Sequence, residues 1–283
     1  MSLSLEFESP PEISLGQVVL QRKPGLEPGD SIPRIQAHLR ELVVPAVPEY
    51  RAVCGLPEGG LPPLYPQILA ESLHRAILAH PEMPLPAAGM VHMRQSVAQV
   101  RPVQEGERVS VTCWVEGQRP ARRGVEFDMH TALRDRGDQV IWRGTSTVLS
   151  KHGPGDGLKR RPPEQPPMRV SRSTTWQVPE SQGRRYAAVS GDWNPIHAHA
   201  LTAKLFGFKR AIAHGMWTLA RALGELDQDL PQHGVGITAS FRRPVFLPSA
   251  LIFESGERGE SLGFELREAR SGKVCLQGSV APL

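Results

Sequence analysis

The stretch Ser190-Gly191-Asp192-Trp193-Asn194-Pro195-Ile196-His197 contains a carboxylate and an imidazole on either side of a proline. Asp192 and His197 are five positions apart, and five residues advance an α-helix by about 500°, so the two side chains could not share one helix face. Pro195 lacks a backbone donor and restricts the residue before it, which predicts a loop that enters or leaves a helix. A bent loop of this kind can turn both side chains into one cavity.

A helical pattern begins at the run Ala213-His214-Gly215-Met216. Apolar residues recur at helical spacing from there, at Met216, Leu219, Ala220, Leu223 and Leu226. Gly215 is therefore expected near the start of a helix, where the first N–H groups have no partner inside the helix and the macrodipole is positive. Because glycine has no Cβ, a substrate can approach these groups closely. We expect the Gly215 amide to be a candidate donor to an oxyanion.

The eight residues from Ser190 to His197 match the signature Ser-Gly-Asp-x-Asn-Pro-(Ile/Leu)-His of the R-specific hydratase 2 family, also called MaoC-like dehydratases. Gly207-Phe208 and Ala211-Ile212-Ala213-His214-Gly215-Met216 also resemble that family, and the resemblance is densest over residues 186–226. It implies a hot-dog fold, in which an antiparallel sheet wraps a long central helix. The implied activity is the reversible hydration of trans-2-enoyl thioesters to (R)-3-hydroxyacyl thioesters.

Carried over by position, the resemblance implies that Asp192 and His197 are the catalytic pair and that Gly215 polarises the thioester carbonyl. Dehydration of a 3-hydroxyacyl thioester needs a base for the α-hydrogen, an acid for the hydroxyl and stabilisation of an enolate-like oxygen, and these residue types supply all three. Which of the pair is the acid and which is the base is left open. We also expect Ser190 and Asn194 to support substrate binding.

We expect this acid/base site to work without a metal or redox cofactor. His199 and His214 could join His197 as ligands, but no cysteine or carboxylate stands beside them at a familiar zinc spacing. His214 is expected to pack or to form a hydrogen bond at the helix start. Two other functions stay open, thioester hydrolysis on the same fold and non-catalytic acyl binding. The intact Asp/His pair argues against hydrolysis, and retention of the whole signature argues against binding alone. An isolated Asp-x-Asn-Pro turn is commonly only structural, but this copy stands within the full eight-residue match and is followed by His-Gly-Met.

The composition is typical of a soluble globular protein. The 283 residues are 40% hydrophobic and 22% charged, with a net charge of +4, and their number predicts two domains. A basic rim would suit the phosphates of coenzyme A or the acidic surface of an acyl carrier protein. The candidates for this contact are Arg184, Arg185, Arg242 and Arg243. Nucleic-acid binding is disfavoured, because aromatic residues make up 6% of the chain and no basic-aromatic motif is present.

The cysteines and the apolar runs predict a cytoplasmic protein. Cys54, Cys113 and Cys275 are odd in number and widely spaced, which gives no disulfide framework and no Cys-x-x-Cys pair. No run approaches the roughly 18 apolar residues of a membrane span, and the first residues lack a basic start followed by an apolar stretch. We leave the oligomeric state open, with a homodimer among the expected partners.

An internal repeat relates the two halves of the chain. Tyr50-Arg51-Ala52-Val53-Cys54-Gly55-Leu56 aligns with Tyr186-Ala187-Ala188-Val189-Ser190-Gly191-Asp192 at an offset of 186 − 50 = 136, with four of the seven residues identical. A helix is expected after each copy, from about residue 65 to 80 in the first half. Aligning Leu69-Ala70 with Leu219-Ala220 needs an offset of 219 − 69 = 150, so the first half lacks about 150 − 136 = 14 residues before its helix.

Strand-like runs follow each expected helix. They cover residues 91–103, 108–115, 125–133 and 139–149 in the first half and 236–246, 250–257, 262–269 and 274–280 in the second. This order predicts an α+β double hot-dog, with residues 1–152 as a degenerate repeat, 153–170 as a Pro/Gly-rich linker and 171–283 as the catalytic repeat. The first repeat has Leu56 in place of Asp192 and lacks the His-bearing turn, so we expect it to pair with the second rather than to catalyse.

Overall fold

The computed structural model describes residues 3–158, 166–231 and 233–283, so part of the expected linker, residues 159–165, lies outside the described residues. The chain forms two compact units. The first is assigned residues 1–46 and 65–163, and the second residues 47–64 and 164–283. The division into 1–152, 153–170 and 171–283 stays a prediction. Among the described residues, no helix is long and apolar enough to cross a membrane.

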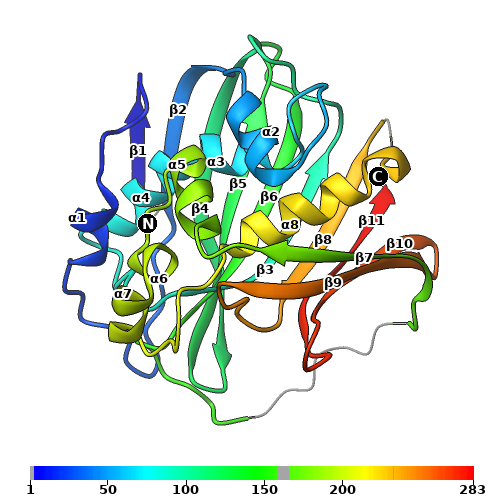
Figure 1. Ribbon diagram of the computed structural model, residues 1–283. Coiled ribbons are helices and arrows are strands. Elements are labelled where there is room, and N and C mark those ends of the chain that lie inside the picture. The colour runs from blue at the N-terminus through cyan, green and yellow to red at the C-terminus, as the bar shows by residue number, and fades with distance from the viewer. Residues whose placement is uncertain (1–2, 159–165, 232) are drawn as a thin grey trace. The chain divides into compact units, whose positions relative to one another are not determined.

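The first unit contains a sheet with the order β1-β2-β4-β5-β6-β3 (Figure 1). Its strands are β1 (Leu3–Phe7), β2 (Ile35–Val43), β3 (Val91–Gln99), β4 (Arg108–Ala121), β5 (Gly124–Arg134) and β6 (Val140–Ser150). Its helices are α1 (Leu15–Val19), α3 (Tyr65–Leu69) and α4 (Glu71–Ala79). The pairing of β1 with β2 is parallel, and the pairs from β2 through β4, β5 and β6 to β3 are antiparallel.

The second unit contains an antiparallel sheet with the order β8-β11-β10-β9-β7. Its strands are β7 (Arg169–Val178), β8 (Val235–Phe241), β9 (Ser249–Arg258), β10 (Ser261–Glu268) and β11 (Val274–Pro282). Its helices are α2 (Pro48–Cys54), α5 (Gln182–Ser190), α6 (Pro195–Ala198), α7 (Ala200–Leu205), α8 (Gly215–Glu225) and the short 3-10 helix η1 (Asp227–Asp229).

The two units repeat one topology. In each, one strand, β2 or β7, directly precedes the main helical segment and four strands follow it, and the sheet orders β2-β4-β5-β6-β3 and β7-β9-β10-β11-β8 correspond strand for strand. Strand β1 is an additional edge strand of the first unit. The main helix of each unit packs on strands of its own sheet, α4 on β2 and β4 and α8 on β11. This is the predicted double hot-dog fold.

Each main helix is held by one apolar face. Leu73 and Ile77 of α4, four positions apart, are fully buried, as is Leu219 of α8, while Leu223 is 2% exposed. Each such side chain contributes roughly 1.5–3 kcal/mol by leaving water. Alanine and leucine also make up much of α8, and both favour the helical backbone. The apolar spacing read from the sequence therefore identified the face that carries the core.

Most predicted elements are present, with shifted ends. The helix expected over residues 65–80 is interrupted at Ala70, which forms the start of α4. The strand expected over 236–246 ends at Phe241, because the N–H groups of Arg242 and Arg243 both point to the Cys275 carbonyl and Pro244 has no donor. The elements that were not predicted are the strands β1, β2 and β7 and the helices α1, α2, α5, α6 and α7.

Candidate active site

The end of helix α5 places the loop that carries Asp192. Gly191 follows the helix in the left-handed conformation, with φ 74° and ψ 1°, and its N–H donates to the carbonyl of Ala187 at 2.9 Å. Glycine adopts this conformation without the steric cost that a Cβ brings. The Ser190 hydroxyl oxygen then accepts a hydrogen bond from the N–H of Asp192 at 3.3 Å. The chain thus turns sharply at the residue where the carboxylate begins.

The next turn is built by Asn194 and Pro195. The side-chain oxygen of Asn194 accepts from the N–H of Ile196 at 3.4 Å and caps the short helix α6. Pro195 occupies the first turn of α6, where its missing donor is harmless, so the proline begins a helix rather than preventing one between Asp192 and His197. Asp192 Oδ1 accepts from the N–H of Asn194 at 3.2 Å. Ser190 and Asn194 therefore use their side chains within the loop, and their expected support of substrate binding stays a prediction.

His197 lies in α6 and is buried, with 8% of its surface exposed. Its Nδ1 is 2.8 Å from the carbonyl oxygen of Ile212. Because a carbonyl can only accept, Nδ1 carries the proton and Nε2 keeps its lone pair in the neutral ring. Burial lowers the pKa of His197, and the nearby Asp192 carboxylate and the bond to Ile212 partly oppose that shift. The side chain is therefore a neutral, oriented proton acceptor.

His214 connects the Asp192 loop to the start of α8. Its Nε2–H donates to the main-chain carbonyl of Asp192 at 2.9 Å and lies 3.7 Å from Asp192 Oδ2. Its ring stacks on that of His197, with centroids 3.6 Å apart and planes inclined by 27°. Burial first, and then the neighbouring His197, lower the pKa of His214 to about 3. The expected hydrogen bond of His214 at the start of α8 is present. It connects to the loop that carries Asp192 and not to α8 itself.

These contacts bring three titratable side chains together. A carboxylate oxygen of Asp192 and one ring nitrogen each of His197 and His214 lie within 4.8 Å of one another. Two imidazoles and a carboxylate are ligands that zinc accepts, but His197 Nδ1 and His214 Nε2 carry protons in the bonds described above. Only the opposite nitrogen of each ring is left as a ligand. The expectation of a metal-free site stays a prediction.

Gly215 begins α8 directly after His214. The first N–H groups of this helix have no partner within it and carry the positive end of its dipole. A Cβ on Gly215 would stand 3.0 Å from the Phe241 ring, so a side chain here would require that ring to shift. Gly183 of α5 has a similar role, since a Cβ there would stand 2.0 Å from the carbonyl oxygen of His197. Glycine at these two positions thus allows Phe241 and the His197 carbonyl to approach the two helices closely.

Comparisons with known proteins assign the chain to a family. The MaoC like domain matches residues 159–277, which include the whole loop and the start of α8. The chain is 33% identical over 260 residues to 3-hydroxyacyl-thioester dehydratase X of Mycobacterium tuberculosis, covering 90% of this chain and 91% of that protein. The chain belongs to the MaoC-like family.

Further relatives of this MaoC-like protein agree with that assignment. The crystal structure of HtdX of Mycobacterium tuberculosis superposes with a TM-score of 0.75 at 31% identity, over 88% of this chain and 100% of that one. An (R)-specific enoyl-CoA hydratase of Aeromonas caviae is 40% identical over 72 residues, which are 24% of this chain and 54% of that enzyme. The family resemblance inferred from the signature is confirmed.

The arginines expected to hold the substrate are placed differently from the catalytic candidates. Arg242 and Arg243 follow β8, their side chains are exposed, and the structure gives them no contact with Asp192 or His197. Arg184 of α5 donates to the carbonyl of Ala198 at 3.0 Å, directly after His197. The expected role of Arg242 and Arg243 in binding substrate stays a prediction. Arg184 instead stabilises the turn that carries His197, through its hydrogen bond to the Ala198 carbonyl.

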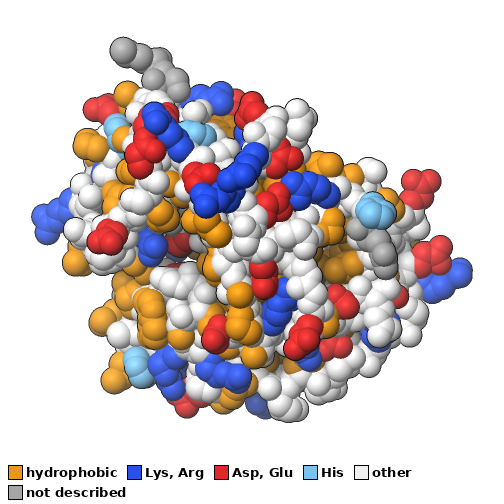
Figure 2. All heavy atoms as spheres, turned by 90° about the horizontal axis from the view of Figure 1, so that it is seen from above, with side chains coloured by type: hydrophobic (Ala, Val, Ile, Leu, Met, Phe, Trp, Pro, Cys, Tyr) orange, Lys and Arg blue, Asp and Glu red, His pale blue; other side chains and the backbone are white. Residues whose placement is uncertain are grey.

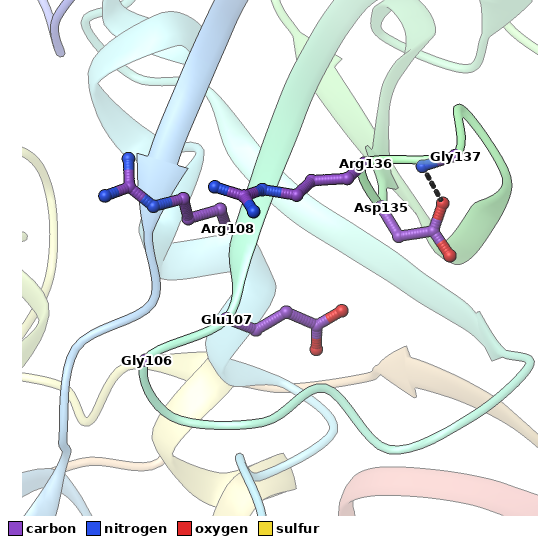
Figure 3. Close-up of a pocket in the computed structure, with 6 residues that line it drawn as sticks. All are labelled: Gly106, Glu107, Arg108, Asp135, Arg136 and Gly137. Atoms are coloured by element: carbon purple, nitrogen blue, oxygen red, sulfur yellow. Dashed lines mark hydrogen bonds between the residues drawn. The ribbon is translucent and has the colours of Figure 1, made fainter.

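A hollow of about 380 Å³ lies between two turns of the first unit (Figure 3). It is lined by Gly106, Glu107, Arg108, Asp135, Arg136 and Gly137. Its carboxylates already have partners, since Arg101 binds both and the N–H of Gly137 donates to Asp135 Oδ1 at 3.0 Å. The hydrogen bond from Arg101 holds the pKa of Glu107 below its usual value. The hollow therefore offers no free acid or base for the family's chemistry.

Proposed function

We propose that this MaoC-like protein is a hydro-lyase that reversibly hydrates trans-2-enoyl thioesters to (R)-3-hydroxyacyl thioesters, with coenzyme A or an acyl carrier protein as the thiol. The proposal is supported by relatives named 3-hydroxyacyl-thioester dehydratase and (R)-specific enoyl-CoA hydratase. Within the chain, it is carried by the convergence of the Asp192 carboxylate and the His197 ring within 4.8 Å. The free, buried cysteines fit the expected cytoplasmic location.

Asp192 and His197 are proposed to share the proton transfers. In hydration, the oxygen of one water adds to C3 of the enoyl chain, and the proton it loses passes to one member of the pair. A proton from the pair is delivered to C2, so the pair ends with the number of protons it began with. The lone pair on His197 Nε2 and the lowered pKa of that ring favour His197 as the group that accepts from water. The Asp192 carboxylate then stabilises the imidazolium.

Gly215 is proposed to hold the thioester oxygen. As C3 is attacked, negative charge moves onto that oxygen, and an N–H at a helix start donates to it from a fixed position. The Phe241 ring lies next to Gly215, at this end of α8. Loss of one such donor typically costs about 10²–10³ in rate.

Neither a metal nor a redox cofactor has a step in this scheme. Hydration changes no oxidation state overall, and the acid, the base and the oxyanion donor all come from the chain. Dialysis against a chelator is expected to leave the hydration rate unchanged. A rate that falls on dialysis and returns with one divalent metal would instead assign Asp192, His197 and His214 to a metal centre.

One assay separates hydration from the competing activities. The purified protein is incubated with a trans-2-enoyl-CoA, and loss of the conjugated double bond, release of free thiol and the configuration of the product are followed together. We expect the double bond to disappear, no thiol to be released, and the product to be the (R)-3-hydroxyacyl thioester. Thiol release at the rate of substrate loss would identify a thioesterase, and binding without turnover would identify an acyl-binding protein.

A further inference from the structure

Helix α7 presents its apolar residues to water. Leu201 and Leu205 lie one helical turn apart, on one face, and are 77% and 84% exposed, whereas Ala203 is fully buried. Phe206, at the end of the helix, is 39% exposed. A surface helix usually turns its large apolar side chains inward. The reversed arrangement in α7 leaves an apolar strip that the second unit does not cover with its own residues.

The charged residues that neighbour this strip along the sequence are all positive. Between residues 193 and 220 the charged residues are Lys204, Lys209 and Arg210, and all three are exposed. The face displayed in Figure 2 has Lys and Arg side chains interspersed with Asp and Glu. Among the described residues, no carboxylate pairs with Lys204 or Lys209 at ion-pair distance. We call Leu201, Lys204, Leu205, Phe206, Lys209 and Arg210 the α7 surface.

The α7 surface is attached directly to the turn that carries His197. The Thr202 hydroxyl donates to the carbonyl of Pro195 at 2.6 Å, and the N–H of Ile212 donates to the carbonyl of Ile196 at 3.1 Å. The same short segment therefore bears the exposed strip on one side and the buried imidazole on the other. A partner bound to α7 would therefore contact the segment that carries His197.

We propose that the α7 surface is the docking site for an acidic acyl carrier protein that delivers the enoyl chain as its phosphopantetheine thioester. The inference rests on the proposed function and adds a partner to it. Cations rim the surface and attract a partner rich in Asp and Glu, while Leu201, Leu205 and Phe206 supply the apolar contact that a specific interface needs at its centre. Coenzyme A has the same thioester but no protein surface, so it does not use the apolar strip.

The test compares two thioesters of one enoyl chain, on coenzyme A and on an acyl carrier protein. The variants are Leu205→Ser and the pair Lys204→Glu with Lys209→Glu. Leu20→Ser, at a leucine that is 83% exposed in the first unit, and Arg136→Glu are the matched controls. We expect kcat/KM for the carrier thioester to fall about tenfold or more in both α7 variants, which is the effect of losing a central interface contact. For the coenzyme A thioester and for the controls, we expect changes within about twofold.

Salt adds a second measurement. The kcat/KM for the carrier thioester is expected to fall as NaCl is raised, with a weaker dependence in the lysine variant, because exposed charges are screened. Equal losses on both thioesters, or no loss on either, would overturn the docking site. So would a wild-type protein that hydrates only the coenzyme A thioester, or a Leu205→Ser variant that only dissociates a dimer. If neither thioester is hydrated, the proposed function itself fails.

Discussion

Two copies of one short motif, residues 50–56 and 186–192, lie together in the second unit. The chain forms a different turn after each copy. Helices α2 and α5 contact each other, and the rings of Tyr50 and Tyr186 lie 6.1 Å apart at 53°. Each helix is followed by a left-handed glycine, Gly55 with φ 61° and Gly191 with φ 74°. The shared glycine is therefore a structural requirement of the motif. This glycine does not distinguish the copy with the proposed catalytic residues from the copy that lacks them.

The difference begins one residue later. The N–H of Leu56 folds back to the carbonyl of Arg51 at 2.9 Å, and the Arg51 guanidinium binds the carbonyls of Pro57 and Gly59 at 2.7 and 2.6 Å. In the second copy, Ala187 stands at the position of Arg51, and no guanidinium closes the loop. The loop after Gly191 is instead held by His214. One scaffold thus supports a closed turn in one copy and an acid/base turn in the other.

The largest effect is expected at Asp192. Asp192→Asn keeps the size of the side chain and removes its negative charge, so kcat/KM for enoyl-CoA hydration is expected to fall about 10²–10⁴-fold. Adding Leu56→Asp to this variant should restore nothing, because the first copy has no histidine at the corresponding turn. The hydration rate and the far-ultraviolet circular dichroism are compared for both proteins. Recovery of activity in the double variant would contradict the assignment of catalysis to the second copy alone.

His197 should set the acidic limb of the pH profile. Its pKa is lowered by burial, so the ring stays neutral below the usual value near 6.5 and kcat/KM is expected to fall only below about that pH. His197→Gln is expected to lose about 10²-fold at neutral pH and to lack this limb. Measuring kcat/KM for the wild type and for His197→Gln over a range of pH shows whether the acidic limb is lost. An unchanged limb in His197→Gln would move the titration to another group.

His214 is expected to make the second copy sensitive to acid. Its pKa is about 3 in the folded protein and near 6.5 in the unfolded chain, so the unfolded state binds the proton first as pH falls. Stability is therefore complete above about pH 6.5 and declines below it. Urea unfolding at pH 7.5 and pH 5 should show a smaller decline in His214→Phe than in the wild type. Equal declines would mean that the proton binds elsewhere.

The smallest expected effects compare the two left-handed glycines. Gly191→Ala places a Cβ in open space, so only the backbone conformation is penalised, by about 1 kcal/mol. A Cβ at Gly55 would stand 2.5 Å from the Arg221 guanidinium, whose hydrogen bond to the Gly55 carbonyl would also be disturbed. Gly55→Ala should therefore cost about 2 kcal/mol in the free energy of unfolding. Chemical denaturation measures both, and equal costs would show that Arg221 moves freely.

Sequence patterns predicted the elements that bury one regular face. Helix α8 and the strands after each helix follow periods that the core imposes, so their existence could be inferred. Strand β7 was harder to predict, because its first five residues are all exposed and only Thr174, Trp176 and Val178 alternate with exposed neighbours. Strand β2 does alternate, with Ile35, Ala37 and Leu39 fully buried, and that period could have identified it.

The candidate site was predictable in its residues and less so in its contacts. The spacing of Asp192 and His197 indicated a turn, but the role of Pro195 as a helix start depends on the capping bond of Asn194. The part of His214 was underestimated. Its bond to the main chain of Asp192 joins residues 22 positions apart, and no local pattern encodes such a contact.

Gly183 shows what the first copy would need in order to carry the same acid/base turn. The carbonyl of His197 occupies the place that a β-carbon on α5 would need, at 2.0 Å. The first copy has Val47 at the matching position, 183 − 136 = 47. Restoring the missing insertion and the aspartate there would leave the graft with a steric block, so a designer would have to begin with Val47→Gly. The absence of a side chain at this position is therefore a further requirement of the reaction centre, besides the aspartate and the insertion.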